Sequence, residues 1–401
     1  MKQELRYPIP SDAPLEPPEE WAELRDECPV ARVTLPSGDQ ATLLTRYEDV
    51  KQVLSDPRFS RTLTAPDAAR LSATGDGGLF NSRLAQIIPD GGEDHQHWRR
   101  LVIRWFTAKR MSDLRPAMTE MAERLVDEMV AGGAPGDLRA SLGFPLPVYV
   151  ICAMLGVPAA DRDRFAHWSD TLLNLTRYEQ AEIEAAQAEF FQYMSEHLAA
   201  KRAEPGDDLL SELLAAGGPE EGGLSELQVL VTGMGLLVAG HETTANMIGK
   251  MVAMLLADRT RWERLLADRS LVRTAVEETL RMDANPGIGL PRYLHEEVEV
   301  GGTVLPRGTT VLCSMAAANR DESVFERADE LDLSRKPNPH LTFGAGPHSC
   351  LGMALARTEL QVVLEVLLRK LPSLELAVPA AELERVEGLA VGGLATVPVR
   401  W

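Results

Sequence analysis

The chain has 401 residues, of which 45% are hydrophobic and 25% are charged, the composition of a globular protein long enough to bury a large core. Its formal net charge of -19 disfavours binding to nucleic acid or to an anionic membrane surface, because like charges repel. The four cysteines, Cys28, Cys152, Cys313 and Cys350, lie far apart in the sequence. This spacing excludes a zinc-finger motif and a disulfide framework, and it favours a reducing cytoplasm.

The N-terminal 21 residues are rich in proline and acidic residues and contain no apolar segment. They therefore predict neither a signal peptide nor a membrane anchor. The longest apolar stretch, residues 144–157, is too short to span a bilayer and contains Pro145 and Pro147. We expect a cytoplasmic protein that is not integral to a membrane.

Strand-like patterns lie near the two ends of the chain. Residues 31–45 alternate and break at Ser37-Gly38, as a hairpin would. Residues 298–314 contain two turn signals, at 301–302 and at 306–308, and a last strand-like segment covers residues 389–401. We expect small β-sheet regions at these places.

The middle of the chain has the apolar periodicity of helices. It extends over residues 111–130, 161–201 and 353–371. The longest helix is predicted to begin at Ser225, where Ser225 and Gln228 have the spacing of a capping box, and to run for about 30 residues, or about 45 Å. The prediction is a mainly α chain that forms a single domain over residues 1–401.

The most informative segment is Phe343-Gly-Ala-Gly-Pro-His-Ser-Cys-Leu-Gly352. Gly344 and Gly346 allow backbone conformations that other residues rarely adopt. Cys350 comes shortly before the helix predicted to begin near residue 353, and a thiolate there is stabilised by the positive end of the helix dipole. For a lone cysteine, a glycine-rich turn with an incidental buried thiol is the competing interpretation.

The complete ten-residue pattern resembles the haem-binding loop of the cytochrome P450 family, Phe-Gly-x-Gly-x-His-x-Cys-x-Gly, and every fixed position is filled. The resemblance implies the cytochrome P450 fold, a helical prism around a haem b with small β-sheet regions. It also implies that Cys350 is the iron ligand, whose electron donation favours O–O cleavage in this family. The resemblance extends over essentially the whole chain and is closest to the soluble bacterial branch.

Two further segments agree with the resemblance. Glu278 and Arg281 are three residues apart and share a helix face, which alone is also typical of a surface ion pair. In the P450 family a Glu-x-x-Arg helix before the cysteine loop forms a structural salt-bridge cluster. His241-Glu242 begins a zinc-protease motif, but residue 245 is alanine instead of the second histidine, so that interpretation fails.

The segment Ala239-Gly-His-Glu-Thr-Thr244 on the long helix resembles the oxygen-activation motif of the family. The small residues Ala239 and Gly240 would let haem, dioxygen and substrate approach the helix. The resemblance assigns proton delivery to Glu242 and Thr243, an acid beside an alcohol. An ordinary buried or surface pair is the alternative interpretation.

The two haem propionates call for cationic partners. The resemblance assigns this role to His95 and Arg99, which are four residues apart on one predicted helix, to Arg292, and to His348. His97 is the alternative to His95 if the register differs, because the run before His95 departs from the family's usual pattern.

The sequence contains no flavin or iron–sulfur motif, so the resemblance implies electrons from a ferredoxin and a ferredoxin reductase. The expected reaction is the insertion of one oxygen atom of O2 into an apolar natural product, a step of secondary metabolite biosynthesis. Alternatives are a haem-thiolate peroxygenase, an oxidative coupling enzyme and a non-enzymatic haem sensor. A local basic cluster is a candidate ferredoxin-docking site, with a solvated helix face as the equal alternative: Arg100, Arg104, Lys109 and Arg110.

Substrate contacts are expected from residues 77–88, the helix around Asn174, and residues 236–243, 286–290 and 392–394. The individual pocket candidates within these segments are Ala239, Gly240, Ile288, Gly289, Leu290 and Leu394.

Overall fold

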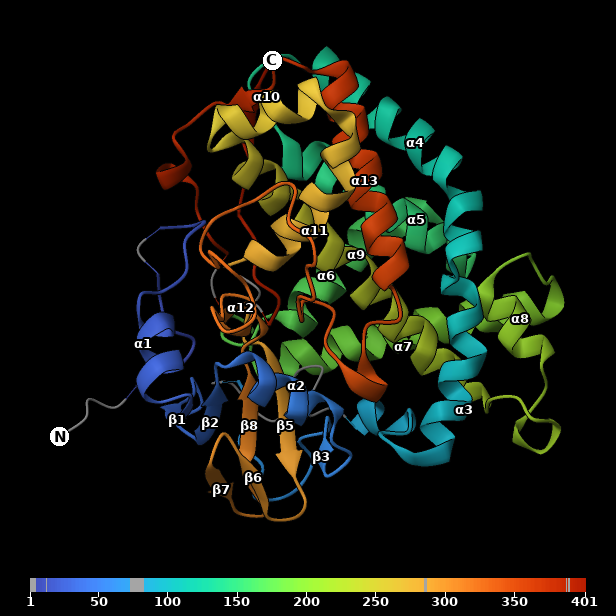
Figure 1. Cartoon of the computed structure of the whole chain (residues 1–401). Helices are drawn as coiled ribbons and strands as arrows, with labels where there is room; N and C mark the ends of the chain where they lie inside the picture. Colours follow the sequence, from blue (N-terminus) through green and yellow to red (C-terminus); the bar gives the residue numbers. More distant parts are fainter. Residues whose placement is uncertain (1–4, 12, 73–82, 285–286, 387, 389) are drawn as a thin grey trace.

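The computed structural model describes residues 5–11, 13–72, 83–284, 287–386, 388 and 390–401. Figure 1 shows most of the helices gathered above and to the right of a strand-rich region. The helices are α1 (Glu20–Glu27), α2 (Tyr47–Ser55), α3 (Gly92–Ile103), α4 (Ala108–Ala131), α5 (Pro145–Leu155), α6 (Arg162–Leu173), α7 (Gln180–Ala203), α8 (Leu209–Ala215), α9 (Glu226–Leu256), α10 (Arg259–Ala267), α11 (Val272–Met282), α12 (Met315–Ala318) and α13 (Met353–Lys370). Within the described residues, no helix is both long enough and apolar enough to cross a membrane.

Among the described residues, the strands form three small sheets. They are β1 (Val30–Thr34), β2 (Gln40–Leu44), β3 (Phe59–Ser60), β4 (Gly136–Asp137), β5 (Leu290–Leu294), β6 (Val298–Val300), β7 (Thr303–Leu305), β8 (Thr310–Cys313), β9 (Glu375–Leu376) and β10 (Pro398–Arg400). The largest sheet has the order β1-β2-β8-β5-β3, in which β2 and β8 are parallel and the other pairs antiparallel. The predicted hairpin at residues 31–45 is confirmed as β1–β2, and the segment 298–314 forms β6, β7 and β8.

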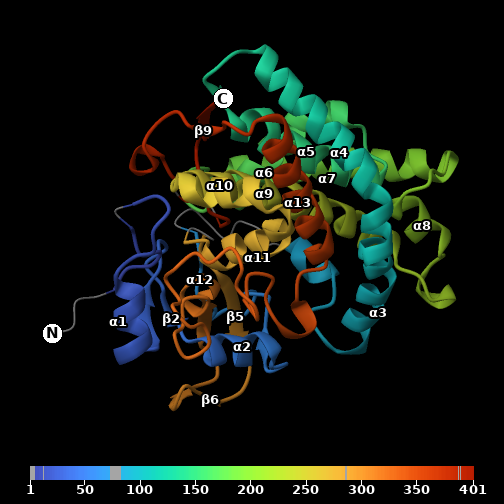
Figure 2. The same cartoon turned by 45° about the horizontal axis from the view of Figure 1, so that its top comes forward.

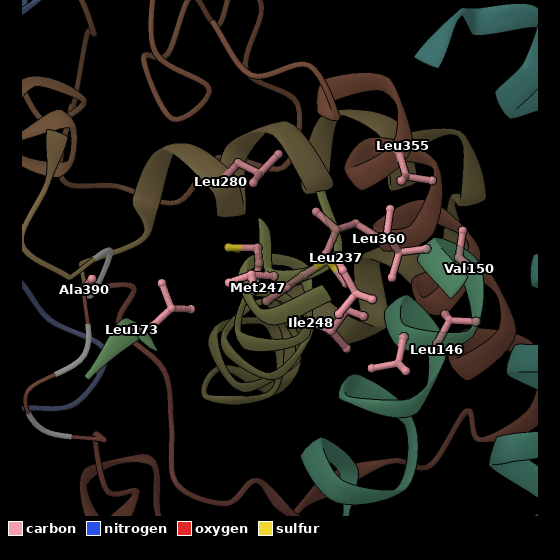
Figure 3. Close-up of a cluster of buried hydrophobic side chains, with 14 of the residues drawn as sticks. Leu146, Val150, Leu173, Leu237, Met247, Ile248, Leu280, Leu355, Leu360 and Ala390 are labelled. Atoms are coloured by element: carbon pink, nitrogen blue, oxygen red, sulfur yellow. The ribbon is translucent and has the colours of Figure 1, made fainter. Parts of the chain in front are cut away.

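Helix α9 is the centre of the hydrophobic core. It begins where the sequence predicts, because the Ser225 hydroxyl accepts a hydrogen bond from the Gln228 amide and the Gln228 side chain accepts one from the Ser225 amide. Side chains from α5, α11 and α13 surround it, and Figure 3 shows Leu237 and Ile248 of α9 among these neighbours. Figure 2 shows α13 beside α9 from a second direction. The packing of α5, α11 and α13 therefore determines which faces of α9 are buried in the core.

Two predicted segments differ from the structure in how far their helix or strand extends. The helical pattern over residues 161–201 is divided into α6 and α7, because Asn174 accepts hydrogen bonds from the amides of Thr176 and Arg177 and turns the chain. The strand-like segment 389–401 contains a strand only at β10, and residue 389 lies outside the described residues.

Candidate active site

The loop before α13 is shaped by two glycines in the left-handed region. Gly344 has φ +69° and Gly346 has φ +68°. A Cβ atom on Gly346 would lie 2.6 Å from the Cα atom of Ser55 in α2, so the loop packs closely on that helix. The Cys350 amide donates a hydrogen bond to the Phe343 carbonyl at 2.8 Å, which closes the loop and fixes the cysteine three residues before α13.

Cys350 is an exposed residue, although neighbouring protein groups desolvate its thiol. Burial raises the pKa of its thiol, while a hydrogen bond from the Gly352 amide and the charges of Arg99 and Arg357 oppose this effect. The Gly352 amide at the N-cap of α13 acts in the direction that the sequence predicts, whereas desolvation acts against it. A metal ion in contact with the sulfur would favour its ionised form.

An accessible stripe interrupts the otherwise buried middle of α9. Ala239 and Thr243, four residues apart, are exposed, and Leu236 and Gly240 are partly exposed. The Thr243 hydroxyl donates to the Ala239 carbonyl at 2.9 Å, so its oxygen lone pairs stay available as acceptors. Gly240 has a packing role as well, since a Cβ atom there would lie 2.8 Å from the Ile151 side chain of α5.

Glu242 is buried on another side of the same helix turn. The amide nitrogen of Asn246 donates to one carboxyl oxygen at 3.1 Å, and a guanidinium nitrogen of Arg139 lies 3.7 Å from the same oxygen. The Nε2 atom of His241 lies 3.9 Å from the other oxygen, and Nδ1 of His241 bonds to the Leu237 carbonyl at 2.6 Å. Burial lowers the pKa of His241, which favours the neutral ring.

Three buried polar atoms beside Glu242 have no hydrogen-bond partner among the described residues: Arg139 Nε, His241 Nε2 and Asn246 Oδ1. Buried polar atoms of this kind are normally satisfied by ordered water. The surroundings of Glu242 are therefore suited to holding water and exchanging protons.

The cations that the sequence places near a haem edge meet beside the cysteine loop. The rings of His95 and His348 are 4.4 Å apart, and His95 is buried, so His95 and not His97 occupies this place. Arg99 donates to the Ser349 carbonyl at 2.7 Å. Burial, together with the nearby charges of cationic neighbours, lowers the pKa of His348 to about 4.

Arg292 provides the clearest test of whether these residues fit a haem. Its side chain is 4% exposed and donates to the carbonyl of Pro291, but it has no ion-pair partner in the part of the chain that the structure describes. A buried guanidinium without an anion is costly. Arg292 and Arg99 therefore suit an anionic ligand, and the two propionates of a haem meet this requirement.

Sequence reasoning missed Arg61 and Asp90. Their side chains form an ion pair at 3.2 Å, and the charge of Arg61 acts on His95, His348 and Arg292. Arg61 follows β3 directly, and β3 pairs with β5, the strand that carries Arg292. Among the described elements, only this pairing indicates that Arg61 lies near Arg292, and the local sequence does not reveal the pairing.

The Glu-x-x-Arg pair is part of the buried core instead of the surface. Glu278 and Arg281 are both fully buried and joined by two hydrogen bonds of 2.8 and 2.9 Å. Burial raises the pKa of Glu278, but hydrogen bonds from Arg281 and Arg335 hold it below its usual value. Arg281 also donates to the carbonyls of Asn319 and Ala328, so the pair fastens α11 to the segment before the cysteine loop.

The pocket candidates separate into two groups. Ala239, Gly240 and Leu290 are at least partly accessible, and Leu290 also lies against the loop glycine Gly344. The remaining three are buried, and their contact with substrate stays a prediction: Ile288, Gly289 and Leu394. Residues 77–82 and 286 of the expected substrate segments lie outside the described residues.

Comparisons with known proteins bear directly on this arrangement. The cytochrome P450 family model matches residues 19–378. The chain is 42% identical over 383 residues to the mycinamicin IV hydroxylase/epoxidase of Micromonospora griseorubida, covering 95% of this chain and 94% of the relative. It is also 42% identical over 396 residues to the nocardicin C N-oxygenase of Nocardia uniformis subsp. tsuyamanensis, covering 98% of both.

The fold is similar to that of solved P450 structures. The structure of CYP105P1 in complex with filipin I superposes with a TM-score of 0.90 at 34% identity, covering 100% of this chain and 99% of that chain. Three findings support one conclusion. The family model matches most of the chain, and two relatives are 42% identical to it. The cysteine loop packs on α2, and the fold contains a buried Glu-x-x-Arg pair. The chain belongs to the cytochrome P450 family and is a P450 monooxygenase.

Proposed function

We propose that the chain acts as a single domain that holds haem b, with Cys350 as the iron ligand, and inserts one oxygen atom of O2 into a bulky, largely apolar small molecule. The observation that carries the proposal is the exposed Cys350 on its glycine loop, together with half-buried Arg99 and buried Arg292, which have no carboxylate partner in the described chain. Haem with a thiolate ligand supplies O–O bond cleavage and oxygen transfer when bound.

The side chains around the sulfur have separate tasks in this proposal. Arg99, Arg292 and His348 bind the propionates, and the His95 ring lies tilted against the His348 ring, with the centroids 4.4 Å apart. His348 offers a ring N–H group as the hydrogen-bond donor.

On α9, Thr243 lies on the accessible stripe and orients water through its hydroxyl oxygen. Glu242 takes protons from the polar side chains behind it, and Thr243 passes them toward the ligand-facing side. Because the side chain of Ala239 is small, a substrate can lie close to α9 at this stripe.

The substrate class is proposed from the relatives, whose names record oxidation of mycinamicin IV and of nocardicin C. The test is incubation with 18O2, a ferredoxin, a ferredoxin reductase and a panel of bulky natural products. We expect one 18O atom in the product. Oxidation supported by hydrogen peroxide alone, with none supported by the ferredoxin system, would favour a peroxygenase and contradict the proposal.

We also propose that a ferredoxin docks on the basic patch, defined as Arg100, Arg104 and Lys109. These residues are exposed on α3, the turn after it and α4, and Arg99 of the same α3 contacts the residue before Cys350. Arg110 is drawn inward over the Trp105 ring and is left out of the patch. Charge reversal at Arg104 should reduce both the rate of reduction by ferredoxin and its dependence on salt. An unchanged salt dependence would overturn this docking site.

A further inference from the structure

A second group of side chains, separate from the propionate-binding residues, lies between α11 and the cysteine loop. Glu277 of α11 accepts two hydrogen bonds from Arg357 of α13, at 2.8 and 2.7 Å. The Nε2 atom of His340 lies 3.1 Å from a Glu277 oxygen. The Arg357 guanidinium lies over the Phe343 ring, 4.8 Å from its centroid. We call Glu277, Arg357, His340 and Phe343 the α11–α13 clamp.

The α11–α13 clamp acts on Cys350 in two ways. Phe343, which carries the Arg357 guanidinium on its ring, supplies the carbonyl that accepts the Cys350 amide hydrogen bond at 2.8 Å. Arg357 also lies near the start of α13, seven residues after Cys350, so its positive charge acts on the electrostatic potential at the sulfur. A displacement of Arg357 would therefore change both the loop and the electrostatic potential at the sulfur.

The acidic member of the clamp is held ionised. Burial raises the pKa of Glu277, but hydrogen bonds from His340 and Arg357 hold it below its usual value. The bidentate geometry of Arg357 on a carboxylate is strong and directional. The neighbouring Glu278 faces Arg281 and Arg335 instead, so the two successive glutamates of α11 serve different groups.

We propose that Arg357 and Glu277 are positioning residues that set the charge at the Cys350 sulfur. Arg357 stabilises the anionic sulfur, while Glu277 holds the guanidinium in place and offsets part of its charge. This inference rests on the proposed function, in which that sulfur is the iron ligand. A less electron-rich sulfur makes the bound iron easier to reduce, so the two residues should shift its reduction potential in opposite directions.

The experiment measures the midpoint potential of haem-loaded wild type, Arg357→Met and Glu277→Gln by spectroelectrochemistry, without any redox partner. The matched control is Glu365→Gln, which removes an ion pair between Arg115 and the same helix α13 at 2.7 Å, farther along that helix from the cysteine loop. We expect a lower potential for Arg357→Met and a higher one for Glu277→Gln. Each shift should be about threefold or more in the one-electron equilibrium constant, which corresponds to about 28 mV, with no shift in the control.

The outcomes separate the possible failures. Shifts of the same sign in both variants would indicate simple loosening of the loop and would overturn the inference, as would potentials equal to the wild type. If Arg357→Met does not fold, the sign for Glu277→Gln decides. A wild type whose reduced carbon monoxide complex lacks the red-shifted Soret band of thiolate ligation would refute the proposed function instead.

Discussion

The side chain of Glu359, in the middle of α13, is fully buried, and neither carboxyl oxygen has a hydrogen-bond partner among the described residues. Burial raises the pKa of this carboxyl well above the ordinary value of 4.5. An ionised carboxylate without a partner is very unfavourable in such surroundings, so the group is neutral in the folded protein.

The sign of this shift fixes how stability depends on pH. Below the ordinary pKa both the folded and unfolded states carry the proton, and the carboxyl adds no penalty. Above it the unfolded chain loses the proton while the folded chain keeps it, so the folded state loses about 1.4 kcal/mol per pH unit until the pH reaches the folded-state pKa. Glu359→Gln has nearly the same shape and does not titrate, so its stability relative to wild type should rise with pH.

The assay is urea unfolding of the haem-loaded wild type and Glu359→Gln between about pH 5 and about pH 7, followed by circular dichroism. Glu365→Gln, at an exposed position of the same helix, serves as the control. A difference between Glu359→Gln and wild type that stays constant over this range would refute the interpretation of Glu359 as a buried neutral acid.

Three further predictions follow from the site. Arg281→Met removes one of the two arginines that bind the buried Glu278 carboxylate and leaves the carbonyls of Asn319 and Ala328 without its hydrogen bonds. It should lower the free energy of unfolding by about 3–5 kcal/mol, measured by urea unfolding, and a change typical of an exposed pair would contradict the buried geometry. Arg292→Met should speed haem transfer to apomyoglobin by about tenfold, since a hydrogen bond to a charged group contributes roughly 1.5–3 kcal/mol, and an unchanged rate would exclude a propionate contact. Glu242→Gln should slow product formation with O2 by about 100-fold or more, measured as product per unit time, whereas unaltered turnover would exclude its role in proton delivery.

Features that depend on neighbouring residues could be predicted from the sequence. The start of α9 follows from the side chains of Ser225 and Gln228, and the shape of the cysteine loop follows from Gly344 and Gly346. In both cases the determining contacts lie within a few residues, so the spacing in the sequence carries the geometry.

Features that depend on contacts distant in the sequence could not be predicted. The break between α6 and α7 combines the local Asn174 turn with a hydrogen bond from the Leu175 amide to the Gly388 carbonyl, and helical periodicity cannot reveal that distant contact. The β3–β5 pairing brings Arg61 near Arg292. The choice of His95 over His97 likewise needed the position of His348, more than 250 residues away in the sequence.

The central claim, that Cys350 supplies a thiolate to haem iron, is tested most directly by the absorbance difference spectrum of the dithionite-reduced protein with carbon monoxide. We predict a strongly red-shifted Soret band in the wild type and its loss in Cys350→His. A wild type that retains haem without this band, or a Cys350→His variant that keeps it, would contradict the account.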